Sequence, residues 1–233
     1  MSRGIITIDD IPSKNTPAIV DYLKEKGIRA ILFATGGNIE HYYEEAVYAV
    51  KNGMIVGNHS YSHPHFSALS LEECKEEIEK CEAILDQLYR DSGVERIYRP
   101  FRFPYGDKGG ENRAELQQYF REKQFDKVDD CCIPYPWWRE LEMDQDIDTF
   151  WSFDFEEYRM HQEPDFTEES VLQKIRNENP QAGTPLFGEK NWHMILMHAH
   201  DATEKILPGY YRRFLDRLLE KGFIFEEPRF VKK

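Results

Sequence analysis

The chain has 233 residues and a formal net charge of −13, with 43 acidic against 30 basic side chains. This balance argues against a protein that follows nucleic-acid phosphates or docks on an anionic membrane surface, and no run approaches the roughly 20 apolar residues of a membrane span. Strand and helix signals alternate without a Pro-, Gly- or Ser-rich linker, which predicts a single domain over residues 1–233.

The apolar pattern predicts strands and helices that alternate along the chain. Strands are expected at residues 4–8, 28–33, 54–56, 96–103, 150–153, 192–197 and 223–225. Helices are expected at residues 16–26, 39–50, 71–88, 111–123, 171–175 and 208–221. Ser70 and Glu73 form a capping box at the start of the third helix. This order predicts an α/β fold, an incomplete barrel of mainly parallel strands.

The cysteines and the first residues of the chain indicate a cytoplasmic protein. Cys131 and Cys132 are adjacent, and Cys74 and Cys81 fit one helix face, which is not the framework of a secreted disulfide-rich domain. We expect Cys74 and Cys81 to pack in the core. The acidic pair at Asp9 arrives before the apolar segment of a signal peptide could fit, so we expect no such peptide.

Histidines and carboxylates follow several predicted strands, at the edge where parallel α/β folds gather functional side chains. His59 and His63 stand at i and i+4, and neutral imidazole is a good ligand for a divalent transition metal. One carboxylate from Asp9 or Asp10 would complete a set that leaves positions open for water and substrate. Without this convergence, the same spacing fits histidines that only pack or face solvent.

The adjacent carboxylates Asp9 and Asp10 suggest a division of labour. Consecutive strand residues point to opposite sides, so one can bind the ion while the other acts as a general base. A bidentate cation would keep that base ionised, and Arg102 or Arg99 could supply it. An Asp-Asp pair at a strand end also fits a helix or turn cap.

His198 closes the apolar run at residues 194–197 and is the candidate general acid that protonates a leaving amine. His200 lies on the same side of an extended chain and is the alternative acid. The remaining histidines have no comparable context, and we expect no role for them in the site.

Five short motifs occur in one order along the chain. They are Thr7-Ile8-Asp9-Asp10, His59-Ser60-Tyr61-Ser62-His63, Arg102-Phe103-Pro104-Tyr105, Trp151 with Asp154, and Leu196-Met197-His198. This order resembles the polysaccharide deacetylase family, carbohydrate esterase family 4, and the similarity extends over about residues 4–227. The resemblance implies a distorted (β/α)7 barrel and a metal-dependent N- or O-deacetylase.

The resemblance also implies how the first two motifs are used. Asp9 would be the general base, and Asp10, His59 and His63 would be the ligands of one divalent ion. We expect zinc, with cobalt, manganese, nickel or iron as alternatives.

The resemblance implies that residues of the other motifs orient the base and stabilise the transition state. Arg102 would orient Asp9, and the backbone N–H of Tyr105 would help to hold the oxyanion. His198 would be the acid, which fits the need for a donor at the oxygen and a proton at the nitrogen.

The fourth motif departs from the family pattern. Glu157 and Tyr158 stand where the family usually has Asp and Trp. By register Glu157 would tune His198, whereas Asp154 is the only aspartate retained, so both are candidates. Ile11 replaces the usual Gly after the Asp pair, and its bulk would narrow the groove and disfavour a long polymer such as chitin.

Residues 133–148 look like an insertion rich in aromatic side chains. Tyr135, Pro136, Trp137 and Trp138 either present a face on which a sugar ring stacks or pack beneath the loop.

These observations predict a hydrolase of non-peptide C–N bonds that removes the acetyl group of an N-acetylated sugar or oligosaccharide, as in O-antigen or capsule biosynthesis. The alternatives are hydrolysis of a small cyclic amide or imide, and a catalytically silent carbohydrate-binding protein of the same fold. The presence of both Asp9 and Asp10 favours turnover. No nucleic-acid partner is expected, and the sequence leaves the oligomeric state open.

Overall fold

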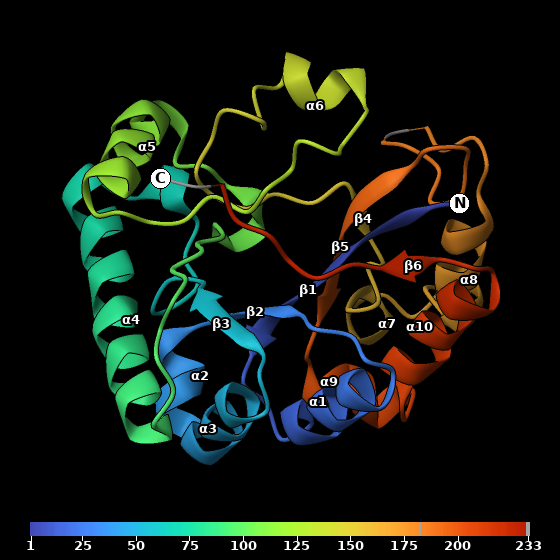
Figure 1. The fold of residues 1–233 in the computed structure, drawn as a ribbon, viewed down its shortest axis with the longest axis horizontal. Coiled ribbons are helices and arrows are strands. Elements are labelled where there is room, and N and C mark those ends of the chain that lie inside the picture. Colours follow the sequence, from blue (N-terminus) through green and yellow to red (C-terminus); the bar gives the residue numbers. More distant parts are fainter. Residues whose placement is uncertain (182, 232–233) are drawn as a thin grey trace.

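The computed structural model describes residues 1–181 and 183–231. Six strands form one sheet of order β3-β2-β1-β5-β4, with β6 beside β1. The paired strands are parallel, so their carboxyl ends meet at one edge (Figure 1). The strands are β1 (Arg3–Ile11), β2 (Ile31–Ala34), β3 (Ile55–Asn58), β4 (Phe153–Asp154), β5 (Trp192–His198) and β6 (Ile224–Phe225).

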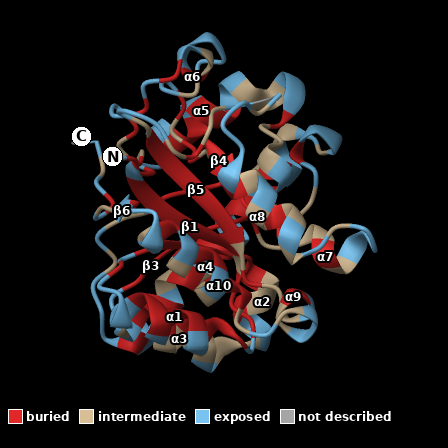
Figure 2. Ribbon diagram, turned by 90° about the vertical axis from the view of Figure 1, so that its right-hand side faces the viewer, coloured by how far each residue is buried: buried red, intermediate tan, exposed pale blue. Residues whose placement is uncertain are grey.

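Helices surround the sheet, with α4 and α5 on one side of the strands and α8 and α10 on the other (Figure 1). Their outward faces are exposed, whereas β1 and β5 are buried at the centre (Figure 2). The helices are α1 (Thr16–Glu25), α2 (Gly36–His41), α3 (Tyr43–Lys51), α4 (Leu71–Ser92), α5 (Arg113–Glu122), α6 (Pro136–Glu140), α7 (Arg159–Gln162), α8 (Glu168–Arg176), α9 (Asp201–Ile206) and α10 (Tyr210–Glu220). The α/β class with parallel strands is therefore confirmed. None of the helices in the described residues combines the length and apolar character needed to cross a membrane.

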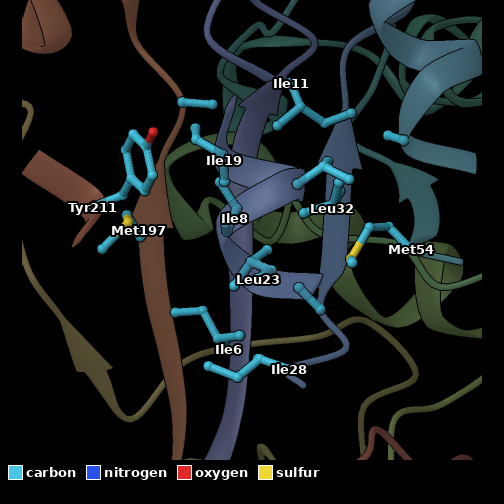
Figure 3. Close-up of a cluster of buried hydrophobic side chains, with 14 of the residues drawn as sticks. Ile6, Ile8, Ile11, Ile19, Leu23, Ile28, Leu32, Met54, Met197 and Tyr211 are labelled. Atoms are coloured by element: carbon cyan, nitrogen blue, oxygen red, sulfur yellow. The ribbon is translucent and has the colours of Figure 1, made fainter. Parts of the chain in front are cut away.

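Strand β1 is buried on both faces, as parallel strands covered by helices usually are. Ile6 and Ile8 join the larger apolar cluster, in which Ile19 and Leu23 of α1 pack over the sheet (Figure 3). Ile5, on the opposite face, joins a second cluster together with side chains of β2, β5 and the 128–138 segment. This burial on two sides fixes β1 at the centre of the molecule, and its carboxyl end therefore lies at the centre of the edge.

Most predicted elements are present within a few residues of their expected bounds, including the capping box of Ser70 and Glu73. Cys74 and Cys81 are buried and free, as expected. The predicted helix at 39–50 is instead two helices, because Tyr42 between α2 and α3 has non-helical dihedrals of −123° and 52°. The apolar spacing does not reveal this break, since side chains on both sides of it face the same core.

The strand expected at residues 96–103 is wrong. Only Phe101 pairs there, in an isolated bridge to Asn58 at the end of β3. Pro100 has no N–H to donate to a ladder, and it packs directly against Gly57, where a Cβ would lie 2.8 Å from the Pro100 carbonyl oxygen. The segment still closes beside β3, because Asn58 N–H donates to Pro100 O at 2.9 Å and Arg102 N–H to Asn58 O at 3.0 Å.

The aromatic residues at 135–138 divide between core and surface. Tyr135 and Trp138 are only 5% and 2% exposed and belong to the second apolar cluster. The Trp138 indole donates to Asp130 Oδ2 at 2.9 Å, and the Tyr135 hydroxyl hydrogen-bonds His193 Nε2 at 2.8 Å. A sugar-stacking face built from all four residues is therefore wrong, and only Trp137 and Pro136 keep accessible surface.

Candidate functional site

A cleft of about 740 Å³ opens at the carboxyl edge of the sheet. Its walls come from the ends of β1, β4 and β5 and from the loops that follow β2, β3 and Phe103. Seven of the expected site residues line it, namely Asp9, Asp10, His59, His63, Tyr105, Asp154 and His198. Arg102 and Glu157 are fully buried behind this wall.

The carboxyl end of β1 brings both aspartates into the cleft. The register of β1 on β2 shifts between Ile8 and Ile11, and Asp10 has a φ of 61°. Pleating alone was expected to send Asp9 and Asp10 to opposite sides, and that expectation is wrong because this bulge turns Asp10 back toward the site. Asn38 supports the bulge by donating its amide N–H to the Asp10 carbonyl at 2.9 Å.

Asp10, His59 and His63 form a compact group of possible metal ligands. One ligand atom from each lies within 4.8 Å of the others. Asp10 Oδ1 is 3.3 Å from His63 Nε2 and 3.9 Å from His59 Nε2. Two imidazoles and one carboxylate are the donor set of an open zinc-like site, so these residues fit a divalent transition metal.

The two histidines are held in the form that can bind a metal. His59 Nδ1 lies 2.8 Å from the Arg102 carbonyl oxygen, which can only accept, so Nδ1 carries a proton and Nε2 is the nitrogen directed at the metal site. Burial lowers the pKa of His63 to about 4, so this ring is neutral at physiological pH. Burial would raise the pKa of Asp10, but the hydrogen bond from His200 and the surrounding histidines hold it well below its usual range.

Asp9 is paired with Arg102 rather than with Arg99. Arg102 Nη1 donates to Asp9 Oδ1 and to Thr7 Oγ1, both at 2.8 Å. Its Nε and Nη2 donate to the carbonyls of Thr149 and Phe150. The pair is therefore made through one nitrogen and not bidentate as expected, because the rest of the guanidinium holds the 149–150 segment. Arg99 instead lies against Glu82, with Nη2 at 2.8 Å from Oε2.

His198 is paired with Glu157, which settles the direct contact left open between Glu157 and Asp154. Glu157 Oε1 accepts from the His198 backbone N–H at 2.5 Å and lies 3.3 Å from its Nδ1. Burial disfavours the imidazolium, but the hydrogen bond and charge of Glu157 outweigh it and raise the pKa of His198 to about 10. Asp154 Oδ1 accepts a hydrogen bond from the Glu156 N–H at 2.8 Å. Burial raises the pKa of the Asp154 carboxyl to about 6.

Backbone strain is concentrated around this cleft. Four of the residues around it have φ between 57° and 65°, a backbone region that residues other than glycine rarely adopt: Asp10, Ser60, His63 and Tyr105. Such residues persist where the surroundings hold them, as Ser60 Oγ does by accepting the His63 N–H at 3.1 Å. The ring of Tyr105 rests edge-on against His63 with centroids 4.5 Å apart. These turns aim short loop segments into one site.

Some contacts of the site carry no signal in the sequence. The Tyr210 hydroxyl of α10 donates to the His198 carbonyl at 2.5 Å, and His200 Nε2 lies 2.7 Å from Asp10 Oδ2. In the sequence, Tyr210 looks like any other apolar residue on the buried face of an amphipathic helix. His200 was an alternative acid by pattern, but the structure places it on Asp10 and leaves Glu157 to His198.

The chain is similar in sequence to a known protein family and to several of its members. The family model described as polysaccharide deacetylase matches residues 3–121. The peptidoglycan-N-acetylmuramic acid deacetylase PdaC of Bacillus subtilis (strain 168) is 35% identical over 115 residues, covering 48% of this chain and 23% of that protein. Chitin deacetylase 1 of Cryptococcus neoformans var. grubii is 34% identical over 114 residues, with the same coverage of 48% and 23%. The chain thus spans about a quarter of the length of these relatives.

The fold is shared with a solved structure. The family 4 carbohydrate esterase from Streptomyces lividans, in complex with acetate, matches with a TM-score of 0.62 at 22% identity, covering 97% of this chain and 92% of that one. At this identity the likeness concerns the fold, a distorted barrel of parallel strands. The family match includes Asp9 through Tyr105, whereas Glu157 and His198 lie beyond it and are placed by the geometry alone.

Proposed function

The chain belongs to the polysaccharide deacetylase family, and from that premise we propose that it hydrolyses the N-acetyl group of an N-acetylated sugar with one divalent metal ion, zinc first among the candidates. The observation that carries the proposal is that one cleft contains all the side chains that the reaction needs. It combines the group of Asp10, His59 and His63 with a buried carboxylate on one side and a protonated imidazole on the other. Hydrolysis of an amide needs these three functions together.

In this proposal Asp9 is the general base. When bound, the ion would act as a Lewis acid toward the acetyl carbonyl and make water more acidic. Asp9 accepts the proton of the attacking water, and Arg102 at 2.8 Å orients the carboxylate. The backbone N–H of Tyr105, in its left-handed turn at the rim of the cleft, stabilises the charge that develops on the acetyl oxygen.

His198 is the general acid of the proposal. Its raised pKa keeps the ring protonated at neutral pH, so that it can deliver a proton to the departing sugar amine. Glu157, through Nδ1, and the Tyr210 hydroxyl, through the backbone carbonyl, hold the ring and its strand end in place. Asp154 also lines the cleft, and its negative charge favours the protonated ring of His198.

We propose an oligosaccharide rather than a single sugar as the substrate. A second cleft of about 600 Å³ adjoins the first and shares Trp151, Asp154 and Tyr158 with it. Trp137 forms part of its wall, and its indole donates to Thr184 Oγ1 at 3.0 Å. An aromatic wall beside polar groups suits a pyranose ring, so a sugar next to the reacting one can occupy this cleft.

The finer assignment is a precursor of a surface polysaccharide, such as O-antigen or capsule, processed by residues 1–233 as one catalytic domain. We place the reaction in the cytoplasm. The support is that Cys131 and Cys132 are adjacent in sequence and exposed, which is not the pattern of a secreted disulfide framework.

Metal analysis together with acetate release tests the proposal. The purified protein should bind one divalent ion and release acetate faster from N-acetyl-chito-oligosaccharides than from nucleotide-linked N-acetyl sugars, and a chelator should stop the release. Asp9→Asn is the control for acetate released by a contaminant. Hydrolysis of a cyclic imide without acetate release would favour the small-amide alternative, and sugar binding without turnover would favour a silent binding protein.

A further inference from the structure

His200 lies at the point where β5 passes into α9, and the pairing of β5 with β1 determines what it contacts. Asp9 lies opposite His198 in the parallel register, and the Ala199 N–H donates to the Asp9 carbonyl at 3.0 Å. The chain therefore still runs alongside β1 when it reaches His200. Because Asp10 is turned into the cleft by the bulge, the His200 ring meets its carboxylate, with Nε2 at 2.7 Å from Oδ2.

The two oxygens of Asp10 have different partners. Oδ1 faces the imidazoles of His63 and His59, at 3.3 Å and 3.9 Å from their Nε2 atoms. Oδ2 lies 2.7 Å from Nε2 of His200. A carboxylate oxygen accepts hydrogen bonds, so Nε2 of His200 donates to Oδ2 across this distance. This bond occupies Oδ2 and leaves Oδ1 directed at the histidine pair.

The ring of His200 is held for this contact and makes no competing one. It stacks on His198, with centroids 5.5 Å apart and planes at 30°, and His161 packs edge-on against it at 5.2 Å. Its Nδ1 is buried and has no hydrogen-bond partner within the part of the chain that the structure describes. Within the described residues, the hydrogen bond of this ring is therefore the one between Nε2 and Asp10.

We propose that His200 is a positioning residue that holds Asp10 as a ligand through Oδ1 alone. Hydrogen bonds to ligating carboxylates orient them and strengthen the site, and a one-oxygen ligand leaves an additional coordination position for water or the acetyl group. The proposal rests on the metal site of the proposed function. It gives His200 a task distinct from the acid role of His198.

The test measures metal affinity rather than turnover. Metal-free wild type, His200→Ala, His200→Gln and His161→Ala are titrated with Zn²⁺ and Co²⁺ by calorimetry or by competition with a chromophoric chelator. His200→Ala should weaken binding by about 10- to 100-fold. His200→Gln, whose amide N–H reaches about as far as Nε2, should stay close to wild type. His161→Ala removes a neighbouring ring that does not touch Asp10, and it should also stay close to wild type.

Three outcomes of these titrations overturn the proposal. Wild-type affinity in His200→Ala would show that the bond to Oδ2 does not matter, and equal losses in the Ala and Gln variants would make His200 a direct ligand. A loss in His161→Ala as large as in His200→Ala would indicate general damage to the rim, which the unfolding midpoint of each metal-free variant also reports. A wild type that binds the ion but deacetylates nothing would remove the proposed function and leave the positioning role standing.

Discussion

The two carboxylates at the end of β1 are neighbours in sequence but have different environments. Asp9 is buried against Arg102, at 2.8 Å, while Asp10 faces the imidazoles of His63 and His200. We expect Asp9→Asn to retain the ion and to lose turnover by about 100-fold or more, because only the base is removed. Asp10→Asn should instead lose metal affinity by at least about tenfold. Equilibrium metal titration and acetate release on both variants check this, and the reverse pattern would exchange the two roles.

The contact between His198 and Glu157 predicts how activity depends on pH. Glu157 raises the pKa of His198 against the opposing effect of burial, so the ring stays protonated and active up to about pH 10. In Glu157→Gln burial is opposed only by the charges of Asp154 and Asp10, so the pKa of His198 falls and the alkaline limb of kcat/KM should move to lower pH. Profiles of amide hydrolysis for the two proteins measure the shift. An unmoved alkaline limb would assign it to another group, such as an acidified water.

At the scale of elements, β3 and the Phe101 bridge depend on Gly57. A Cβ at residue 57 would lie 2.8 Å from both Cγ and the carbonyl oxygen of Pro100, and backbone cannot move aside as a flexible side chain can. Gly57→Ala should therefore lower the free energy of unfolding by about 1–3 kcal/mol. It should also loosen the contact between His59 Nδ1 and the Arg102 carbonyl, since those residues follow the two displaced segments.

Chemical denaturation measures this cost, and Gly37→Ala is the control. The nearest atom to a Cβ at Gly37 is the Tyr61 carbonyl oxygen at 3.5 Å, which is an ordinary contact. If Gly57→Ala unfolds at the same denaturant concentration as Gly37→Ala, the close approach of β3 to Pro100 does not constrain the fold.

At the scale of the whole molecule, segments far apart in sequence build the second cleft, with Trp137 from α6 and residues within 174–180 and 183–186 in its wall. Trp137→Ala should lower kcat/KM for a tetrasaccharide by about 2- to 10-fold, the value of one aromatic contact, and leave a single N-acetylated sugar unaffected. Arg139→Ala on the same helix is the matched control, because Arg139 is exposed and outside this cleft. Equal losses at every chain length would show that no sugar occupies the cleft.

The sequence determined the fold class and the members of the site, because period, capping and motif order are local properties. The capping box at Ser70, the buried run of β5 and the Asp, His and Arg residues of the motifs all follow from short stretches of chain. The family resemblance from these motifs is confirmed by the family match over residues 3–121. The strand expected at residues 96–103 does not form, because Pro100 and its contact with Gly57 limit the pairing to one bridge despite the apolar pattern.

Only the tertiary structure decided which residues touch. Asp9 contacts Arg102 rather than Arg99, Glu157 contacts His198, and His200 contacts Asp10. These contacts depend on where parallel strands end relative to one another, which no local pattern records. The bulge at Asp10 had the same origin, since its φ of 61° is held by contacts from α2 and the neighbouring loops. Residue identities are thus readable from the chain, whereas pairings between distant segments arise only when the sheet aligns them.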